Sequence, residues 1–381
     1  TGGGGGDSCT PGSATSVGVS PTEIKIGNVS QLTGLVPGFG QTGVNGVKAY
    51  FNMVNNQGGV CGRKLTLVQA DDRFQAATNR AETEKLAGSV LGLVGGVSVV
   101  DDGAAPVIDS LGVPDVSLAT TPVRAGAKNN FSPNPINPGP NTGAGNTRIF
   151  QYMKETLGVQ SAAIFYQDAA VAANQRPKYE RDFAAAGIPV VATYAVAVTA
   201  TNFRSQAQDI KQKNIDLVIT IAELNAIANL AKAFQSVGYF PKAPFYGAQV
   251  YGKKYVQLAG SAAENTISAL IFATPEQTGN PGVQAFNSWY GRTNPGADVD
   301  FFSLVGWASA EMFVKALRQT GADPNREKLL SVLRTFTNYS SDMVAPINPA
   351  GKEPSACFNV MQVKGGKWQK IHPAGEGFAC P

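Results

Sequence analysis

The sequence predicts an α/β protein made of two doubly wound parallel-sheet lobes joined by a multi-strand hinge. Three observations lead to this expectation. Strand-like and helix-like segments alternate along most of the chain, which implies βαβ crossovers and parallel sheets. A stretch rich in proline and asparagine, 129–145, interrupts the alternation. The last 110 or so residues hold too few elements for a third domain, so they must complete the first two.

The first lobe is predicted from the spacing of apolar residues, which recur every two residues in a strand and about every 3.6 residues in a helix. The segment EIKIGNV (23–29) alternates as a strand does, and Val44, Val47, Tyr50, Phe51 and Val54 have helical spacing. The same reasoning gives strands at 23–29, 64–70, 91–94 and 113–119, and helices at 43–55, 78–90 and 104–111.

The alternation restarts beyond residue 145, which predicts a second lobe of the same kind. Strands are expected at 162–166, 190–196, 217–222, 245–247 and 266–272, and helices at 176–186, 202–213 and 226–237.

The C-terminal segment is expected to return to both lobes. It contains two amphipathic helices, 304–320 and 326–333, and a hairpin of 357–363 and 367–371 around Gly365-Gly366. The expected boundaries are therefore a tether at 1–15, lobe 1 at 16–138 plus 273–338, and lobe 2 at 139–272 plus 339–381. Such a chain crosses between the lobes more than once, and those crossings form the hinge.

Composition excludes several classes of protein. Hydrophobic residues make up 43% and charged residues 15%, which is typical of a globular chain. The net charge of +4 gives no basic surface for nucleic acid, and no apolar run reaches the roughly 18 residues of a membrane-spanning helix. No GxGxxG or GxxxxGK[ST] nucleotide motif is present.

A single histidine, His372, further limits the chemistry. It lies in a tail rich in lysine, proline and glycine, and we expect it to be solvated. A multi-histidine metal site is impossible, and a histidine-dependent nucleophilic mechanism could use no other residue. We therefore expect no enzyme, no metal and no cofactor.

Four widely spaced cysteines suggest two disulfides and an oxidising compartment. Cys357 and Cys380 flank the predicted hairpin, so we pair them, which leaves Cys9 with Cys61. The alternative is four buried free thiols.

The first seven residues, TGGGGGD, are expected to form a flexible tether. With no charged-then-apolar signal segment, we expect a processed chain. Such a tether often follows a lipid-bearing cysteine, which would lie just before Thr1; the alternative is a disordered end with no anchoring role.

Small hydroxyl residues follow the predicted strands of the first lobe. Ser98 and Thr120 lie where backbone N–H groups at the start of a helix could bind a carboxylate, although both could simply cap their helices. The adjacent carboxylates Asp71-Asp72 and Asp101-Asp102 are interpreted as a cap plus a solvated charge in each pair.

Several segments resemble the type I periplasmic binding proteins that serve branched-chain amino acid importers. They span nearly the whole chain in the family's order: IKIGNVSQLTG (24–34), FNMVNNQGGVCGRKLTLVQADD (51–72), LGLVGGVS (91–98), GVPDVSLATTP (112–122), IFYQD (164–168), YGAQVYG (246–252) and SAEMFVKALRQTG (309–321). The resemblance implies a two-lobed receptor that closes on a small solute and docks on the membrane permease of an ABC importer.

The resemblance also implies positions for the ligand. The carboxylate would be held after the third strand by Ser98, with Val97 and Val99 beside it, and after the fourth strand by Ala119 and Thr120, while Phe39 would wall the pocket. In the second lobe, Asp168 and Tyr251 follow strands and are expected to line the site, and Phe302 is expected to help close it.

Three positions depart from the amino-acid receptors of this family. Gln249 stands where they place the acidic residue that neutralises the ligand ammonium, and Val171 and Ala222 stand where tyrosines are common. Glu223 could replace the missing acid if its side chain turned inward. We therefore predict an apolar or amphipathic carboxylic acid, fatty or aromatic, as the ligand.

Three alternatives remain at this stage. One is a receptor for branched-chain or other amino acids, and a second is a ligand-sensing regulator, because similar lobes occur in amide sensors and hormone-receptor ectodomains. A third is a glycosidase-like enzyme, for which only Asp168 and Glu223 are candidate carboxylates. The expected receptor is an extracytoplasmic monomer with no nucleic-acid partner.

Overall fold

The computed structural model describes residues 9, 12–13, 15–33 and 40–381, which fold into two compact units. Unit 1 comprises Thr1–Pro138, Thr278–Ala297 and Phe302–Ser355, and unit 2 comprises Gly139–Gln277, Asp298–Phe301 and Ala356–Pro381. Residues 339–355 belong to unit 1, whereas the sequence assigned them to lobe 2. Residues 273–277 and 298–301 belong to unit 2, whereas the sequence assigned them to lobe 1. That the two lobes move as separate bodies about a hinge stays a prediction.

Unit 1 is built on a parallel four-stranded sheet with the order β2-β1-β3-β4. Its strands are β1 (Glu23–Ser30), β2 (Lys64–Asp71), β3 (Leu93–Val94) and β4 (Asp115–Val116), so the last two are much shorter than expected. Its helices are α1 (Gln41–Asn56), α2 (Ala76–Ala87), α3 (Ala105–Ser110), α4 (Pro122–Gly126), α10 (Pro281–Thr293), α12 (Arg326–Leu333) and nearly all of α11 (Phe301–Gln319). A 3₁₀ turn, η1, covers Asp101–Gly103.

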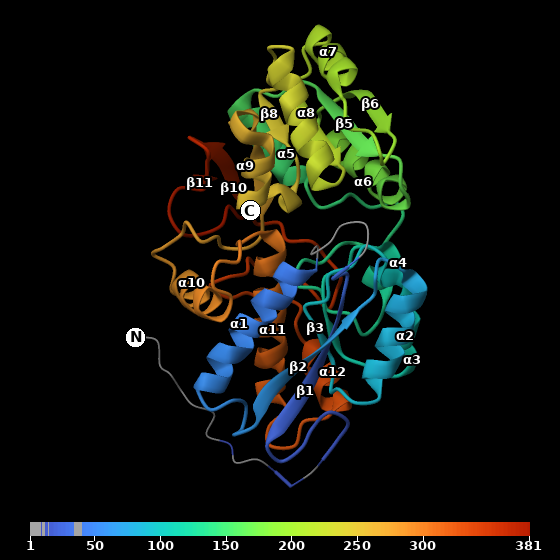
Figure 1. Ribbon diagram of the computed structural model, residues 1–381, viewed down its shortest axis with the longest axis vertical. Coiled ribbons are helices and arrows are strands. Elements are labelled where there is room, and N and C mark those ends of the chain that lie inside the picture. Colours follow the sequence, from blue (N-terminus) through green and yellow to red (C-terminus); the bar gives the residue numbers. More distant parts are fainter. Residues whose placement is uncertain (1–8, 10–11, 14, 34–39) are drawn as a thin grey trace. The chain divides into compact units, whose positions relative to one another are not determined.

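Glycines allow α1 and α11 to pack backbone against backbone. A Cβ on Gly46 would lie 2.2 Å from the carbonyl oxygen of Ser303, and one on Gly306 would lie 1.9 Å from that of Gly43. Only glycine permits so close an approach. Figure 1 shows α1, α10 and α11 on one side of the sheet of unit 1 and α2 and α3 on the other, as a doubly wound arrangement requires.

Unit 2 is built on a seven-stranded sheet with the order β11-β10-β9-β8-β7-β5-β6. The strands are β5 (Ala162–Gln167), β6 (Val190–Val196), β7 (Leu217–Ile221), β8 (Ala243–Phe245), β9 (Ile267–Leu270), β10 (Asn359–Lys364) and β11 (Lys367–His372). The first five are parallel, and the C-terminal hairpin adds β10 antiparallel to β9 and β11 antiparallel to β10.

Helices cover both faces of this second sheet. On one face α5 (Thr147–Leu157) and α6 (Ala170–Ala186) bury Phe150 and Phe183, whose rings stack 4.1 Å apart. The other helices of unit 2 are α7 (Arg204–Gln212), α8 (Leu224–Ser236), α9 (Lys253–Ala259) and the 3₁₀ turns η2 (Ala248–Val250) and η3 (Gly260–Ala263). None of the buried residues of α8 belongs to the cluster that contains Phe150 and Phe183, as expected if α8 covers the other face of the sheet.

The predicted fold class is confirmed, and so is the break at 129–145, which contains no helix or strand. Helices α5, α9 and α10 were not predicted. The expectation for His372 is wrong: it ends β11, is partly buried, and stacks on Tyr152 at 4.3 Å. Among the described helices, none is both long and apolar enough to cross a membrane.

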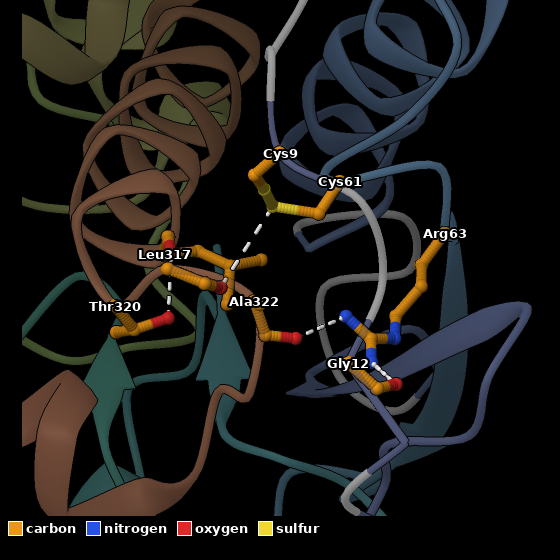
Figure 2. The surroundings of a disulfide bond; sticks show 8 residues. Cys9, Gly12, Cys61, Arg63, Leu317, Thr320 and Ala322 are labelled. Atoms are coloured by element: carbon orange, nitrogen blue, oxygen red, sulfur yellow. Dashed lines mark hydrogen bonds between the residues drawn. A yellow bond between two sulfur atoms is a disulfide. The ribbon is translucent and has the colours of Figure 1, made fainter.

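Both predicted disulfides are present. Cys9 pairs with Cys61 in unit 1, and Cys357 pairs with Cys380 in unit 2. Figure 2 shows that buried Arg63 donates hydrogen bonds to the carbonyl oxygens of Gly12 at 2.8 Å and Ala322 at 2.6 Å. Cys9 and Gly12 are therefore fastened to unit 1, although 1–15 was expected to be a tether; residues 1–8, 10–11 and 14 lie outside the described part.

We predict that each disulfide stabilises its own unit. The bonds join residues 52 and 23 positions apart, so chain entropy gives about 4 and about 3 kcal/mol respectively. Hydrogen exchange of the Cys9→Ala/Cys61→Ala variant should show lost protection mainly in unit 1, and that of Cys357→Ala/Cys380→Ala mainly in unit 2. Each double variant is the control for the other, and equal loss in both units from either one would contradict the prediction.

Candidate functional site

Hydrogen bonds join the carboxyl ends of β1, β3 and β4 in unit 1. The backbone N–H of Gln31 donates to the carbonyl of Val97 at 2.9 Å, and that of Val97 donates to Ser30 Oγ at 3.1 Å. Thr120 Oγ1, beyond β4, donates to the carbonyl of Ser98 at 2.6 Å. The structure thus brings together Val97, Ser98, Val99, Ala119 and Thr120 from two segments separated by about 20 residues of sequence.

Two backbone donors within this group have no acceptor in the part of the chain that the structure describes. Ser98 is 2% exposed and Ala119 is 3% exposed. Among the described residues, none accepts a hydrogen bond from the N–H of Ser98 or of Ala119. Unpaired N–H groups in buried residues are rare in proteins, so these two are candidate donors to a ligand.

Gln31 adds an unpaired polar side chain at the same edge. It is 1% exposed, and neither its Oε1 nor its Nε2 has a hydrogen-bond partner among the described residues. A buried primary amide without partners costs free energy that a polar ligand group would recover. Sequence reasoning missed this residue, although the motif SQLTG places a polar side chain directly after a buried strand.

The other donor predicted for the ligand, Thr120, is engaged by the protein. Its backbone N–H donates to Asp101 Oδ2 at 2.6 Å, while Thr121 donates to Asp101 Oδ1 from both its N–H at 3.2 Å and its hydroxyl at 2.6 Å. The expected capping roles are also different, because Thr121 rather than Thr120 caps α4, and Ser98 Oγ accepts from the N–H of Val100 at 3.2 Å.

Each of the pairs Asp71-Asp72 and Asp101-Asp102 was expected to contain one capping and one solvated carboxylate, and the structure agrees only in part. Asp102 is exposed, but Asp101 is 3% exposed and buried with its three hydrogen bonds. Asp71 fastens the loop after β1 by accepting from the N–H groups of Leu32 at 3.0 Å and Thr33 at 3.2 Å. No described group of acidic, histidine and cysteine side chains could hold a metal ion.

In unit 2, Glu223 is the N-cap of α8. Its Oε1 accepts from the N–H of Ala226 at 2.6 Å, and its Oε2 accepts from the N–H of Asn225 at 2.7 Å. The side-chain amide of Gln167 holds the preceding turn, since its Oε1 accepts from the N–H of Glu223 at 2.8 Å. Both carboxylate oxygens are therefore already occupied by the helix end.

The remaining candidates of unit 2 differ in their surroundings. Asp168 is exposed, and Ala222 and Gln249 are partly buried. Gln249 folds back over Gly247, where a Cβ would lie 2.5 Å from Gln249 Oε1. Val171 lies in α6, and its side chain, like the whole of Phe39, is outside the described part, so both roles stay predictions.

The two other aromatic candidates are packed to different degrees. Tyr251 is 3% exposed, donates its hydroxyl to Glu276 Oε2 at 2.8 Å, and packs on Trp368 at 5.6 Å. Burial and the neighbouring Glu276 raise the pKa of Tyr251 well above its usual value. Phe302 is partly buried in the first turn of α11. Their contact with a ligand stays a prediction.

A family model described as periplasmic binding protein matches residues 23–367. No curated protein sequence matches the chain. The solved structures similar to this one include a fatty acid ABC transporter substrate-binding protein from Thermomonospora curvata, which is 20% identical over 96% of this chain and 95% of that one, with a TM-score of 0.79.

Two further solved structures carry ligands in their descriptions. A solute-binding protein of an ABC transporter from R. palustris, in complex with benzoate, is 19% identical over 94% of this chain and 98% of that one, with a TM-score of 0.74. A branched-chain amino acid transporter substrate-binding protein from Streptococcus pneumoniae, in complex with isoleucine, is 18% identical over 92% of this chain and 100% of that one, with a TM-score of 0.76. At these identities the likeness establishes the fold.

We predict that Glu223 acts through the helix end and not through the ligand. Glu223→Ala should lower the free energy of unfolding by about 1 kcal/mol, because two N–H groups of α8 lose their acceptor, and should leave ligand affinity within about twofold. Urea unfolding and calorimetry measure the two effects, and Glu155→Ala, which removes the same side chain at an exposed position on α5, is the control. A tenfold loss of affinity at unchanged stability would contradict the capping role.

Proposed function

The chain belongs to the periplasmic binding protein family, and from that premise we propose that it is the extracytoplasmic solute-binding receptor of an ABC importer. The proposed ligand is an apolar or amphipathic carboxylic acid, fatty or aromatic, on which two lobes close by a hinge motion. The family match over most of the chain supports the receptor role. The partner is then a membrane permease, and the receptor is a monomer that carries out no chemistry.

The proposed ligand class rests mainly on one observation. None of the predicted site residues offers an acidic side chain that is free to pair with the ammonium group of an amino acid. Gln249 is neutral where amino-acid receptors of the family place a carboxylate, and Glu223 uses both oxygens to cap α8. Asp168 is exposed, so it offers no desolvated partner. Burying an ammonium without a counter-charge costs several kcal/mol, about the binding energy of a small ligand.

The other end of the site suits a carboxylate. The N–H groups of Ser98 and Ala119 can donate to its two oxygens, and hydrogen bonds between amides and a charged acceptor are stronger than those between neutral groups. The amide of Gln31 provides a further polar contact at the same edge. A fatty acid and benzoate, the ligands named for two of the similar proteins, belong to this chemical class.

The main alternative is a receptor for branched-chain amino acids. It is favoured by the isoleucine complex among the similar structures. A ligand-sensing regulator is the alternative from another class, and the same lobes would serve it. An anchoring lipid before Thr1 also remains part of the proposal and not of the structure.

We predict that the purified protein binds benzoate or octanoate and does not bind leucine. Thermal-shift screening with these three compounds, followed by calorimetry, gives the answer directly. Binding of leucine with no binding of either acid would overturn the proposed ligand class.

We also predict that Gln249→Glu shifts this preference. A new carboxylate near the ligand should weaken binding of the acids about tenfold or more through like-charge repulsion and provide a partner for the leucine ammonium. The matched control is Gln369→Glu, which adds the same charge at an exposed position on β11. Equal effects of the two variants would contradict a role for position 249 in the site.

A further inference from the structure

The carboxylate of Asp101 is hydrogen-bonded to Thr120, which directly follows Ala119 and contacts Ser98. Its Oδ2 accepts from the N–H of Thr120 at 2.6 Å, Thr120 follows Ala119 directly, and Thr120 Oγ1 donates to the carbonyl of Ser98 at 2.6 Å. The carboxylate of Asp101 and the N–H groups of Ser98 and Ala119 are therefore arranged around one residue. A ligand carboxylate held by those two N–H groups would lie beside a second carboxylate.

Few positively charged side chains lie near the carboxylate of Asp101 to balance its negative charge. The elements packed on η1 are α2, α3 and α4, whose nearest charged residues are Arg80, Asp109 and Arg124. Arg80 pairs with Glu84 at 2.9 Å, and Asp109 accepts from the N–H groups of Lys128 and Asn129, both at 2.9 Å. Asp102, on η1 itself, is exposed. Arg124 is the charged group that acts on Asp101.

Arg124 is shared with another carboxylate. Its Nη2 lies 2.8 Å from Asp115 Oδ2, whereas its Nη1 contacts only the backbone carbonyl of Asp101, at 3.5 Å. Burial raises the pKa of Asp101 to about 6, against the lowering effects of Arg124 and of the hydrogen bonds from Thr120 and Thr121. A second carboxylate nearby would raise it further, because two adjacent carboxyl groups cannot both ionise without a large cost.

We propose that Asp101 is a specificity-determining residue, and that a carboxylate ligand binds at Ser98 and Ala119 together with one proton. This inference rests on the proposed function. The proton comes from solvent and is shared between the ligand and Asp101 in an O–H···O hydrogen bond, so no other group changes its charge. A neutral amide or alcohol needs no proton, because it can donate a hydrogen bond to ionised Asp101 directly.

Proton uptake gives the proposal a defined pH dependence. Above the pKa of Asp101, the Kd for benzoate should rise by up to about tenfold per pH unit, because each bound acid must bring a proton. Well below that pKa, Asp101 is already protonated and the dependence should vanish. Benzamide, if it binds, should show no such dependence from pH 7 to 8.5.

The test is calorimetry of benzoate and octanoate binding at pH 8 in two buffers with different ionisation enthalpies. The wild-type protein should take up close to one proton per ligand bound. Asp101→Asn should bind with almost no proton uptake and with a Kd nearly independent of pH. Asp102→Asn, which removes the exposed neighbouring carboxylate, should behave as the wild type does.

The outcomes separate the two proposals. If the wild type binds an acid at pH 8 without taking up a proton, the role of Asp101 is overturned and the proposed function stands. The same holds if Asp101→Asn takes up as many protons per ligand as the wild type does. Binding of leucine but of neither acid overturns the proposed function and this inference with it. If Asp101→Asn does not fold, the wild-type buffer comparison and its pH series decide alone.

Discussion

The buried hydrogen-bonding groups at the carboxyl edge of the unit 1 sheet are the constraint on which this account depends. The segments that follow β1, β3 and β4 hydrogen-bond to one another. Among the described residues, the N–H groups of Ser98 and Ala119 have no acceptor and the side-chain amide of Gln31 has no partner. Because a protein interior tolerates few such groups, we propose that a ligand pairs with them at this edge. In that proposal the buried carboxylate of Asp101, which is hydrogen-bonded to Thr120, determines the charge of the site.

Most of the architecture could be predicted from the sequence because apolar periodicity is strong in this chain. Strands β1 and β2 and helix α1 followed from spacing alone. Helix α6 begins at Ala170, six residues before the expected start at 176, and it continues through Pro177, a residue that usually interrupts a helix. Helix α10 was missed because Pro281-Gly282 resembles a turn, although Pro281 occupies the first helical position and Asn280 caps it.

The sequence indicated where a ligand site is expected, and that position stays a prediction, but it did not indicate which polar groups there are paired. Topology places ligands beyond the carboxyl ends of the strands, which pointed to Ser98 and Thr120, and the family resemblance added Ala119. Which of their groups are unpaired depends on tertiary contacts: Asp101, interpreted from sequence as part of a capping pair, takes the N–H of Thr120. The role of Glu223 as a helix cap was likewise invisible, since a glutamate at a strand end is compatible with either a cap or a ligand contact.

The most direct test of the central claim is a crystal structure of the protein grown with benzoate or octanoate. The account predicts carboxylate oxygens within about 2.7–3.2 Å of the backbone nitrogens of both Ser98 and Ala119, with one of them close to Asp101. A ligand whose carboxylate lies elsewhere, with these two N–H groups bound to water or to the protein, would contradict it.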